Sequence, residues 1–146
     1  MIEIEDLSEG EINEILGRVG YGHLGCCRDD RPYVVPVHYA YDDGIIYIYT
    51  TEGKKFEIIR TNPNVCLQVE EISDQKHWTS VVVDGIAEQI KRGPQHDRAI
   101  KKIVSVNPTL TPAVSIRWMD DWVRENIEVV YLVTPSATSG RRSVTH

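Results

Sequence analysis

The stretch from residue 47 to residue 63 reads Tyr47-Ile48-Tyr49-Thr50-Thr51-Glu52-Gly53-Lys54-Lys55-Phe56-Glu57-Ile58-Ile59-Arg60-Thr61-Asn62-Pro63. Apolar and polar residues alternate up to Thr51, which predicts a strand. A bend at Gly53 follows, and the apolar spacing then becomes helical until Asn62-Pro63 ends it. The stretch therefore predicts a strand, a turn and a helix that begins with two lysines.

The start of this predicted helix favours an anion. A helix start exposes backbone N–H groups without intrahelical partners and carries the positive end of the helix dipole. Lys54 and Lys55 add positive charge at that place, which predicts a phosphate site. The plainer alternatives are that both lysines are solvated surface charges and that Thr50 and Thr51 are strand or helix-capping residues.

Length and charge narrow the class of ligand. The chain has 146 residues, which predicts a single domain over 1–146 with a substantial core. Its formal net charge is −6, which argues against a general nucleic-acid binder, because such proteins need a surplus of Lys and Arg. A local basic site on an acidic protein suits one small anionic ligand.

The sequence also predicts a cytoplasmic protein with no membrane partner. No apolar run approaches the roughly 20 residues that span a bilayer, and the acidic start, Met1 to Asp6, differs from a signal peptide. The three cysteines, Cys26, Cys27 and Cys66, have neither a disulfide-framework nor a zinc spacing. We expect reduced thiols that pack as small hydrophobes and no metal site.

The remaining pattern predicts strands with few helices. Ser8-Glu9-Gly10-Glu11 is a capping box that should open a helix ending near Gly20, and Asp42-Asp43-Gly44 should form a hairpin turn. Pro36 lacks a donor, so it should lie at a sheet edge, at a bulge or beside something other than a strand. Strands are expected over 23–27, 33–41, 45–51, 64–70, 78–90 and 127–133.

After the fifth strand the spacing becomes helical. Pro94 to Val106 should form a helix, and a less regular helical segment should open at Thr111-Pro112 and contain Trp118, Met119, Trp122 and Val123. The sixth strand should close a small antiparallel barrel, and the tail from about residue 134 should be exposed and partly mobile. The predicted fold class is mainly β, a six-stranded antiparallel barrel with flanking helices.

Several segments, taken in order, carry a family resemblance. Together they resemble the pyridoxamine 5′-phosphate oxidase-like flavoproteins, and within them the branch that includes the nitroimidazole-resistance proteins. The segments are Pro32–Val37, Tyr47–Lys55, Asn62–Cys66, Trp78–Gly85 and the ending Ser139-Gly140-Arg141-Arg142-Ser143. The resemblance implies a split β-barrel of the FMN-binding type and a homodimer with FMN at the subunit interface.

The same resemblance implies which residues contact the cofactor. The implied set is Val35, Pro36 and Val37 against the flavin ring, Tyr49, Thr50 and Thr51 along the ring and ribityl chain, Lys54 and Lys55 at the phosphate, and Trp78 and Ser80 near the cofactor. Packing alone could also explain Tyr49 and Trp78. We expect His23 and His38 to be hydrogen-bonded strand histidines rather than metal or haem ligands.

Departures from the family pattern limit which reactions we expect the protein to catalyse. Many nitroimidazole-resistance proteins have a histidine at the position of Tyr49, so its absence weakens nitroimidazole reduction as the activity. The further basic residues and C-terminal motif of true pyridoxamine phosphate oxidases are also missing, which argues against that oxidation. The chain has no nucleophile elbow, dinucleotide fingerprint or P-loop, so redox chemistry would belong to the flavin.

We therefore expect an FMN-dependent oxidoreductase that passes electrons from a reduced nicotinamide to a small-molecule acceptor, with no catalytic residue identified. A non-catalytic carrier or sensor of flavin, haem or deazaflavin on the same fold is the alternative. A deazaflavin-dependent reductase is a third possibility. The resemblance favours cofactor binding more strongly than any one reaction.

Overall fold

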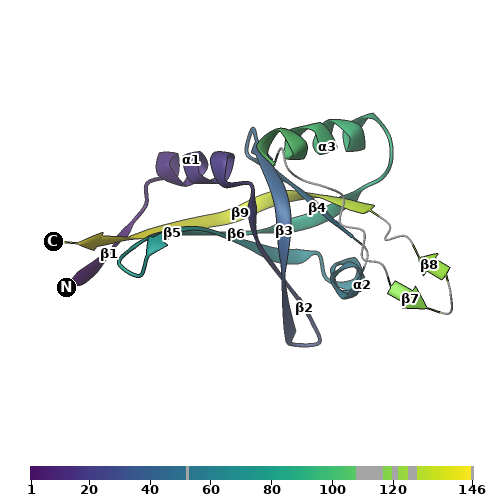
Figure 1. Ribbon diagram of the computed structural model, residues 1–146, viewed down its shortest axis with the longest axis horizontal. Helices are drawn as coiled ribbons and strands as arrows, with labels where there is room; N and C mark the ends of the chain where they lie inside the picture. The colour runs from purple at the N-terminus through teal and green to yellow at the C-terminus, as the bar shows by residue number, and fades with distance from the viewer. Residues whose placement is uncertain (52, 108–116, 120–121, 125–127, 146) are drawn as a thin grey trace.

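A ring of six antiparallel strands forms the body of the protein (Figure 1). The computed structural model describes residues 1–51, 53–107, 117–119, 122–124 and 128–145, with the backbone alone at 117–119, 122–124 and 128. The ring runs β9-β4-β3-β2-β5-β6 and closes where β6 pairs with β9. Its strands are β2 (Tyr21–Arg28), β3 (Arg31–Asp42), β4 (Ile45–Thr51), β5 (Asn64–Asp74), β6 (His77–Ile90) and β9 (Glu128–Thr145). The predicted six-stranded split barrel is confirmed.

Three helices flank the barrel. α1 (Glu9–Val19) and α3 (Pro94–Val106) lie on one side of the molecule in Figure 1, and α2 (Lys54–Thr61) lies near the end of β2. α1 has the predicted capping box, in which Ser8 and Glu11 satisfy each other's backbone N–H. α2 and α3 begin and end where the sequence placed them.

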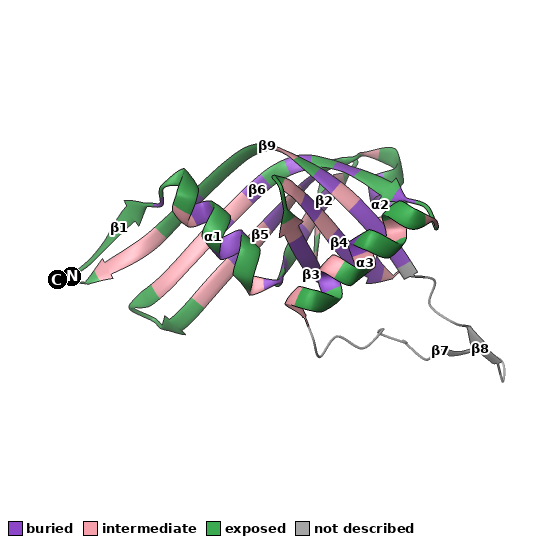
Figure 2. Cartoon of the chain, turned by 90° about the horizontal axis from the view of Figure 1, so that it is seen from above, coloured by how far each residue is buried: buried purple, intermediate pink, exposed green. Residues whose placement is uncertain are grey.

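The apolar residues form two clusters, inside and outside the barrel wall. The larger one fills the barrel and the space under α1, and it includes Leu16, Tyr39 and Ile48. The smaller one lies between α3 and the outer face of β3, β4 and β9, where Tyr49 packs with Ala99 and Ile103. Figure 2 shows this alternation as buried and exposed bands along the strands. Neighbouring residues of one strand therefore face different surroundings.

One expectation about the C-terminal third was wrong. The segment with Trp118 and Trp122 is not helical in its described residues, because β7 (Arg117–Met119) and β8 (Trp122–Arg124) pair antiparallel there. Aromatic and β-branched residues favour strands, and this preference outweighs the four-residue spacing. The other residues expected to be helical, 111–116 and 120–121, lie outside the described residues.

The tail from residue 134 is largely exposed, as expected, and it forms the second half of β9. This strand runs on to Thr145, pairing with β6 as far as Arg142 and with β1 (Ile2–Asp6) over its last residues. Its Ser- and Thr-rich composition resembles a loop, but two neighbouring strands supply the hydrogen-bond partners that hold it extended. The first and last described strands therefore lie side by side (Figure 2).

Candidate flavin site

The outer face of β2, β3 and β4 carries the first group of candidate residues. Directly paired residues of antiparallel strands share a face, and His38 of β3 pairs with both Tyr21 of β2 and Tyr49 of β4. Pro36 pairs with His23 and points to the same side. We call the surface formed by His23, Pro36, His38, Tyr49 and Thr51 the β2–β4 outer face.

Pro36 lies where β3 has a described partner strand on one side only. The β3–β4 pairing begins at His38 and runs toward Asp42, whereas the β2–β3 pairing continues past Pro36 to Arg31. The expectation that Pro36 marks a sheet edge is confirmed. An edge next to an exposed proline leaves room for a flat ligand to lie against the strand.

Not every residue of the predicted set presents its side chain on this face. Val37 is 5% exposed and lies in the barrel core, and Val35 packs against that core. Thr50 is 9% exposed and pairs with Val129 of the core. Along β3 and β4 the outward-facing positions of the predicted set are therefore Pro36, Tyr49 and Thr51, and Val35, Val37 and Thr50 present only backbone groups on this face.

Tyr49 is mostly covered from outside. Its side chain is 8% exposed and packs in the cluster under α3 with Ala40 and Val130. This is the packing role that the sequence left open for it. His38, directly across from Tyr49, is the exposed side chain of this pair.

The lysine pair lies where β4 leads into α2. Gly53 is the N-cap residue of α2 and provides no side-chain hydrogen bond to the first turn. Lys54 is exposed, and its Nζ lies 5.0 Å from the centre of the Tyr33 ring. Lys54 and Tyr33 line a hollow of about 280 Å³ between α2 and the β2–β3 turn, and its charged lining also includes Arg28, Arg31, Asp29 and Glu57.

Lys55 is turned toward the protein rather than toward solvent. Burial lowers the pKa of Lys55 and outweighs the opposing effect of Cys26. Burial likewise raises the pKa of the Cys26 thiol, which donates to the Tyr33 carbonyl at 3.7 Å. No carboxylate among the described residues, which do not include Glu52, forms an ion pair with Lys55, so its partly buried charge has no acidic partner in that part of the chain.

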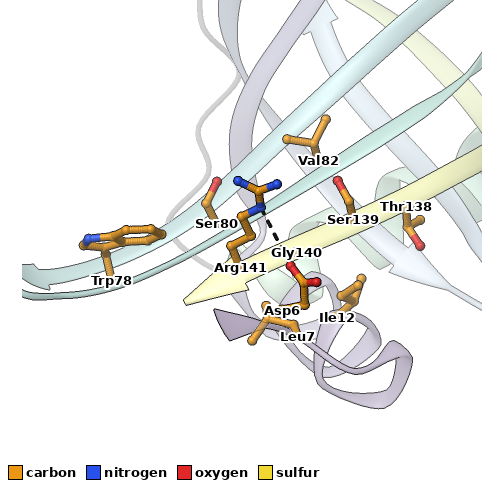
Figure 3. A pocket seen from close by; sticks show the side chains of 10 residues that line it. All are labelled: Asp6, Leu7, Ile12, Trp78, Ser80, Val82, Thr138, Ser139, Gly140 and Arg141. Carbon is orange, nitrogen blue, oxygen red and sulfur yellow. Dashed lines mark ion pairs between the residues drawn. The ribbon is translucent and has the colours of Figure 1, made fainter. Parts of the chain in front are cut away.

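Trp78 and Ser80 lie elsewhere in the same chain. They line a pocket of about 720 Å³ between β6, the second half of β9 and the segment after β1. Figure 3 shows Arg141 in this pocket, between Ser80 and Asp6. Its Nε lies 3.8 Å from Oδ1 of Asp6, and the two side chains form an ion pair. The indole of Trp78 lies at one end of the pocket, half-buried as expected for packing.

Among the hollows that the described residues line, none contains all the predicted residues. Pro36 and Thr51 belong to the β2–β4 outer face, and the lysines belong to the start of α2. Trp78 and Ser80 lie on β6 near its turn to β5, and Ser80 accepts a hydrogen bond of 3.2 Å from Gln68, the β5 residue that pairs with His23. The sequence analysis did not predict that His38, Arg28 and Arg31 lie beside the candidate residues. The alternation along β3 could have placed His38 on the side of Pro36, since the two residues are two positions apart.

Three further observations concern metal ligands, cysteines and membrane helices. The described residues hold no group of three or more His, Cys, Asp or Glu side chains able to bind a metal ion. All three cysteines are free thiols. Among the described residues, no helix is long and apolar enough to cross a membrane.

Comparison with solved structures shows the same fold in other proteins. A FAD-binding protein from Mesorhizobium loti superposes with a TM-score of 0.77 at 30% identity, over 99% of this chain and 100% of that one. A protein from Bacteroides thetaiotaomicron, proposed to be a 5-nitroimidazole antibiotic resistance protein, gives a TM-score of 0.72 at 19% identity, over 99% of this chain and 93% of that one.

Sequence comparison agrees with the fold. A curated relative, the uncharacterized protein RA0666 of Rhizobium meliloti (strain 1021), is 35% identical over 94 residues, which are 63% of this chain and 62% of that protein. The chain thus matches less than two thirds of that relative's length. The family model for pyridoxamine 5′-phosphate oxidase matches residues 8–142. With this match and a barrel shared with a FAD-binding protein, the chain belongs to the pyridoxamine 5′-phosphate oxidase family and has its flavin-binding fold.

Proposed function

We propose that this protein binds FMN at the β2–β4 outer face and uses it as a cytoplasmic oxidoreductase, transferring electrons from NADH or NADPH to a small-molecule acceptor. The observation that carries the proposal is the partly buried Lys55 at the start of a helix without a side-chain cap. A buried charge without an acidic partner costs stability, and a phosphate would remove that cost. The flavin supplies the redox chemistry when it is bound.

The proposed contacts follow the direction of the chain. Pro36 and Thr51 would flank the ring and ribityl chain, while the first backbone N–H groups of α2 and the two lysines would hold the phosphate. The identity of the Mesorhizobium loti relative as a FAD-binding protein supports a flavin as the ligand class. The 280 Å³ hollow beside Lys54 has room for a phosphoryl group.

A second copy of this chain would complete the site. Trp78 and Ser80 line a pocket that does not include the lysines, and a second protomer would bring its own copies of these residues to the flavin. The outer wall of the barrel offers a surface for this second copy. The exposed side chain of Val34 lines a hollow there, and the exposed side chain of Ile86 lies next to that hollow. Val34→Glu should convert a dimer to a monomer in sedimentation velocity, and a wild-type monomer that retains FMN would contradict the dimer.

The test of flavin binding compares two pairs of lysines. Each charge-assisted hydrogen bond to phosphate is worth about 1.5–3 kcal/mol. Lys54→Ala/Lys55→Ala should therefore raise the Kd for FMN at least about a hundredfold. Lys91→Ala/Lys101→Ala removes the same charge from exposed positions and should leave the Kd unchanged. Fluorescence quenching of FMN measures both. Equal affinities in the two double variants, or wild-type protein that takes up no FMN, would refute the proposal.

A non-catalytic flavin carrier is the second candidate, because Tyr49 stands where many nitroimidazole-resistance proteins have a histidine and is buried under α3. Anaerobic mixing of the FMN-loaded protein with NADH or NADPH separates the two functions. An oxidoreductase bleaches the flavin band at a rate that supports turnover. A carrier leaves the band unchanged.

A further inference from the structure

His38 is held by a side chain that is distant in the sequence. Its Nδ1 lies 3.1 Å from Oδ1 of Asn107, the C-cap residue of α3, and 69 positions separate the two residues. An exposed histidine on a strand ordinarily needs no such partner. The protein therefore orients a ring that solvent could reach freely.

The orientation of the Asn107 amide is fixed by two carbonyl groups. Its Nδ2 donates to the Ile103 carbonyl at 3.0 Å and to the Tyr39 carbonyl at 3.3 Å. A carbonyl oxygen only accepts, so Nδ2 must face these two groups and Oδ1 must face His38. Oδ1 also only accepts, so the Nδ1 of His38 carries a hydrogen. In the neutral ring, Nε2 is then the nitrogen without one.

The backbone around Asn107 leaves space for this arrangement. Gly20, the C-cap of α1, has a φ of +80°, and a Cβ built there would lie 3.1 Å from both Oδ1 and Nδ2 of Asn107. The carbonyl of Gly20 also accepts a hydrogen bond of 2.9 Å from the backbone N–H of Tyr39. Two helix ends and β3 thus meet at one amide that faces His38.

His38 lies on the face at which the flavin is proposed to bind. It follows Val37 on β3, shares the outward face with Pro36, and lies directly across from Tyr49. With its Nδ1 on Asn107, its Nε2 remains available to a ligand on the β2–β4 outer face.

We propose that His38 donates a proton from Nε2 to the acceptor during reduction and that Asn107 positions it; this inference rests on the proposed function. Two-electron reduction of an acceptor adds two electrons and two protons. A hydride equivalent from the reduced flavin supplies both electrons and one proton. The imidazolium of His38 gives the second proton from Nε2, becomes neutral with its hydrogen retained on Nδ1, and regains a proton from water.

The first measurement is the tautomer of His38 in the protein without added ligand. Long-range ¹H–¹⁵N spectra should show neutral His38 protonated at Nδ1. His77 provides an internal reference, because its Nδ1 lies 2.8 Å from a carboxylate oxygen of Asp74. Asn107→Ala should shift His38 toward the ordinary tautomer with a hydrogen on Nε2 and leave His77 unchanged. A wild-type His38 already protonated at Nε2 would overturn the positioning role.

The second measurement is the reoxidation of the reduced, FMN-loaded protein in stopped flow. With menadione, which takes up protons, His38→Gln should slow reoxidation about a hundredfold, the lower range for a general acid. With ferricyanide, which takes electrons alone, the variant should match wild type. Asn107→Ala should also slow the menadione reaction selectively. Equal slowing with both oxidants, or none with menadione, overturns the proposal, whereas protein that takes up no FMN refutes the proposed function itself.

Discussion

Replacing Gly20 with alanine should reveal how strongly the junction of α1, β3 and α3 depends on a residue without a side chain. Gly20 has a φ of +80°, and an added Cβ would lie 2.6 Å from Cγ1 of Val106. The left-handed conformation costs an L-residue about 1–2 kcal/mol, and overpacking costs about 1–3 kcal/mol. We expect Gly20→Ala to lower the free energy of unfolding by about 3 kcal/mol.

The assay is urea unfolding followed by circular dichroism, with a thermal melt beside it. At about 3 °C per kcal/mol for a chain of this size, Tm should fall by about 9 °C. The matched control is Gly17→Ala in the same helix, where an added Cβ meets nothing within 4 Å. This variant should gain up to about 1 kcal/mol, because alanine favours a helix more than glycine does. The reasoning would be refuted if Gly20→Ala were as stable as the wild type, or if the two variants changed the free energy of unfolding by the same amount.

Three further predictions concern charges and thiols. Burial lowers the folded-state pKa of Lys55, so the folded protein releases this proton at lower pH than the unfolded chain does. The cost of charging Lys55 is then full at neutral pH and disappears as the pH rises through the window between the lowered and the ordinary pKa. Lys55→Met should accordingly raise the urea midpoint at pH 7, with a gain that narrows in the alkaline range; a constant gain would contradict this cause. Cys26 is buried and its pKa is raised, so mass spectrometry after iodoacetamide treatment at pH 8 should find Cys26 modified more slowly than the half-buried Cys27. Arg142 contacts Glu11 of α1 and, at 2.8 Å, Glu5 of β1. Arg142→Met should speed amide exchange a few-fold in β1 and leave β5 unchanged, whereas unchanged exchange in β1 would show that backbone pairing alone holds the strand.

Much of the fold could be predicted because local signals agreed with it. The Ser8 capping box, the Asp42-Asp43-Gly44 turn and the Asn62-Pro63 stop each act within a few residues, and each element they bound is present. The second half of β9 could not be predicted in this way. Its residues after Thr134 look like a loop, and their partners in β1 and β6 lie far away in the chain.

The candidate site could also be predicted only in part. Lys54 and Lys55 were found because a strand, a bend and a helix start follow one another in the sequence. The resemblance named Val35, Val37 and Thr50 as positions, but the alternation of the strands turns their side chains into the core. The contact between His38 and Asn107 joins residues on different elements, so no local pattern could indicate it.

The double pairing of β9 has a consequence for the order in which the chain folds. Residues 130–133 of β9 pair with β4 on one side and with β6 on the other, so this strand closes the ring. During synthesis β9 leaves the ribosome after every other strand of the barrel. Until then, β4 and β6 each expose an unpaired edge, which is where chains aggregate. A nascent chain stalled before residue 128 should therefore be the species that most needs a chaperone, and substitutions in residues 130–133 should lower the yield of soluble protein more than they lower the stability of the finished barrel.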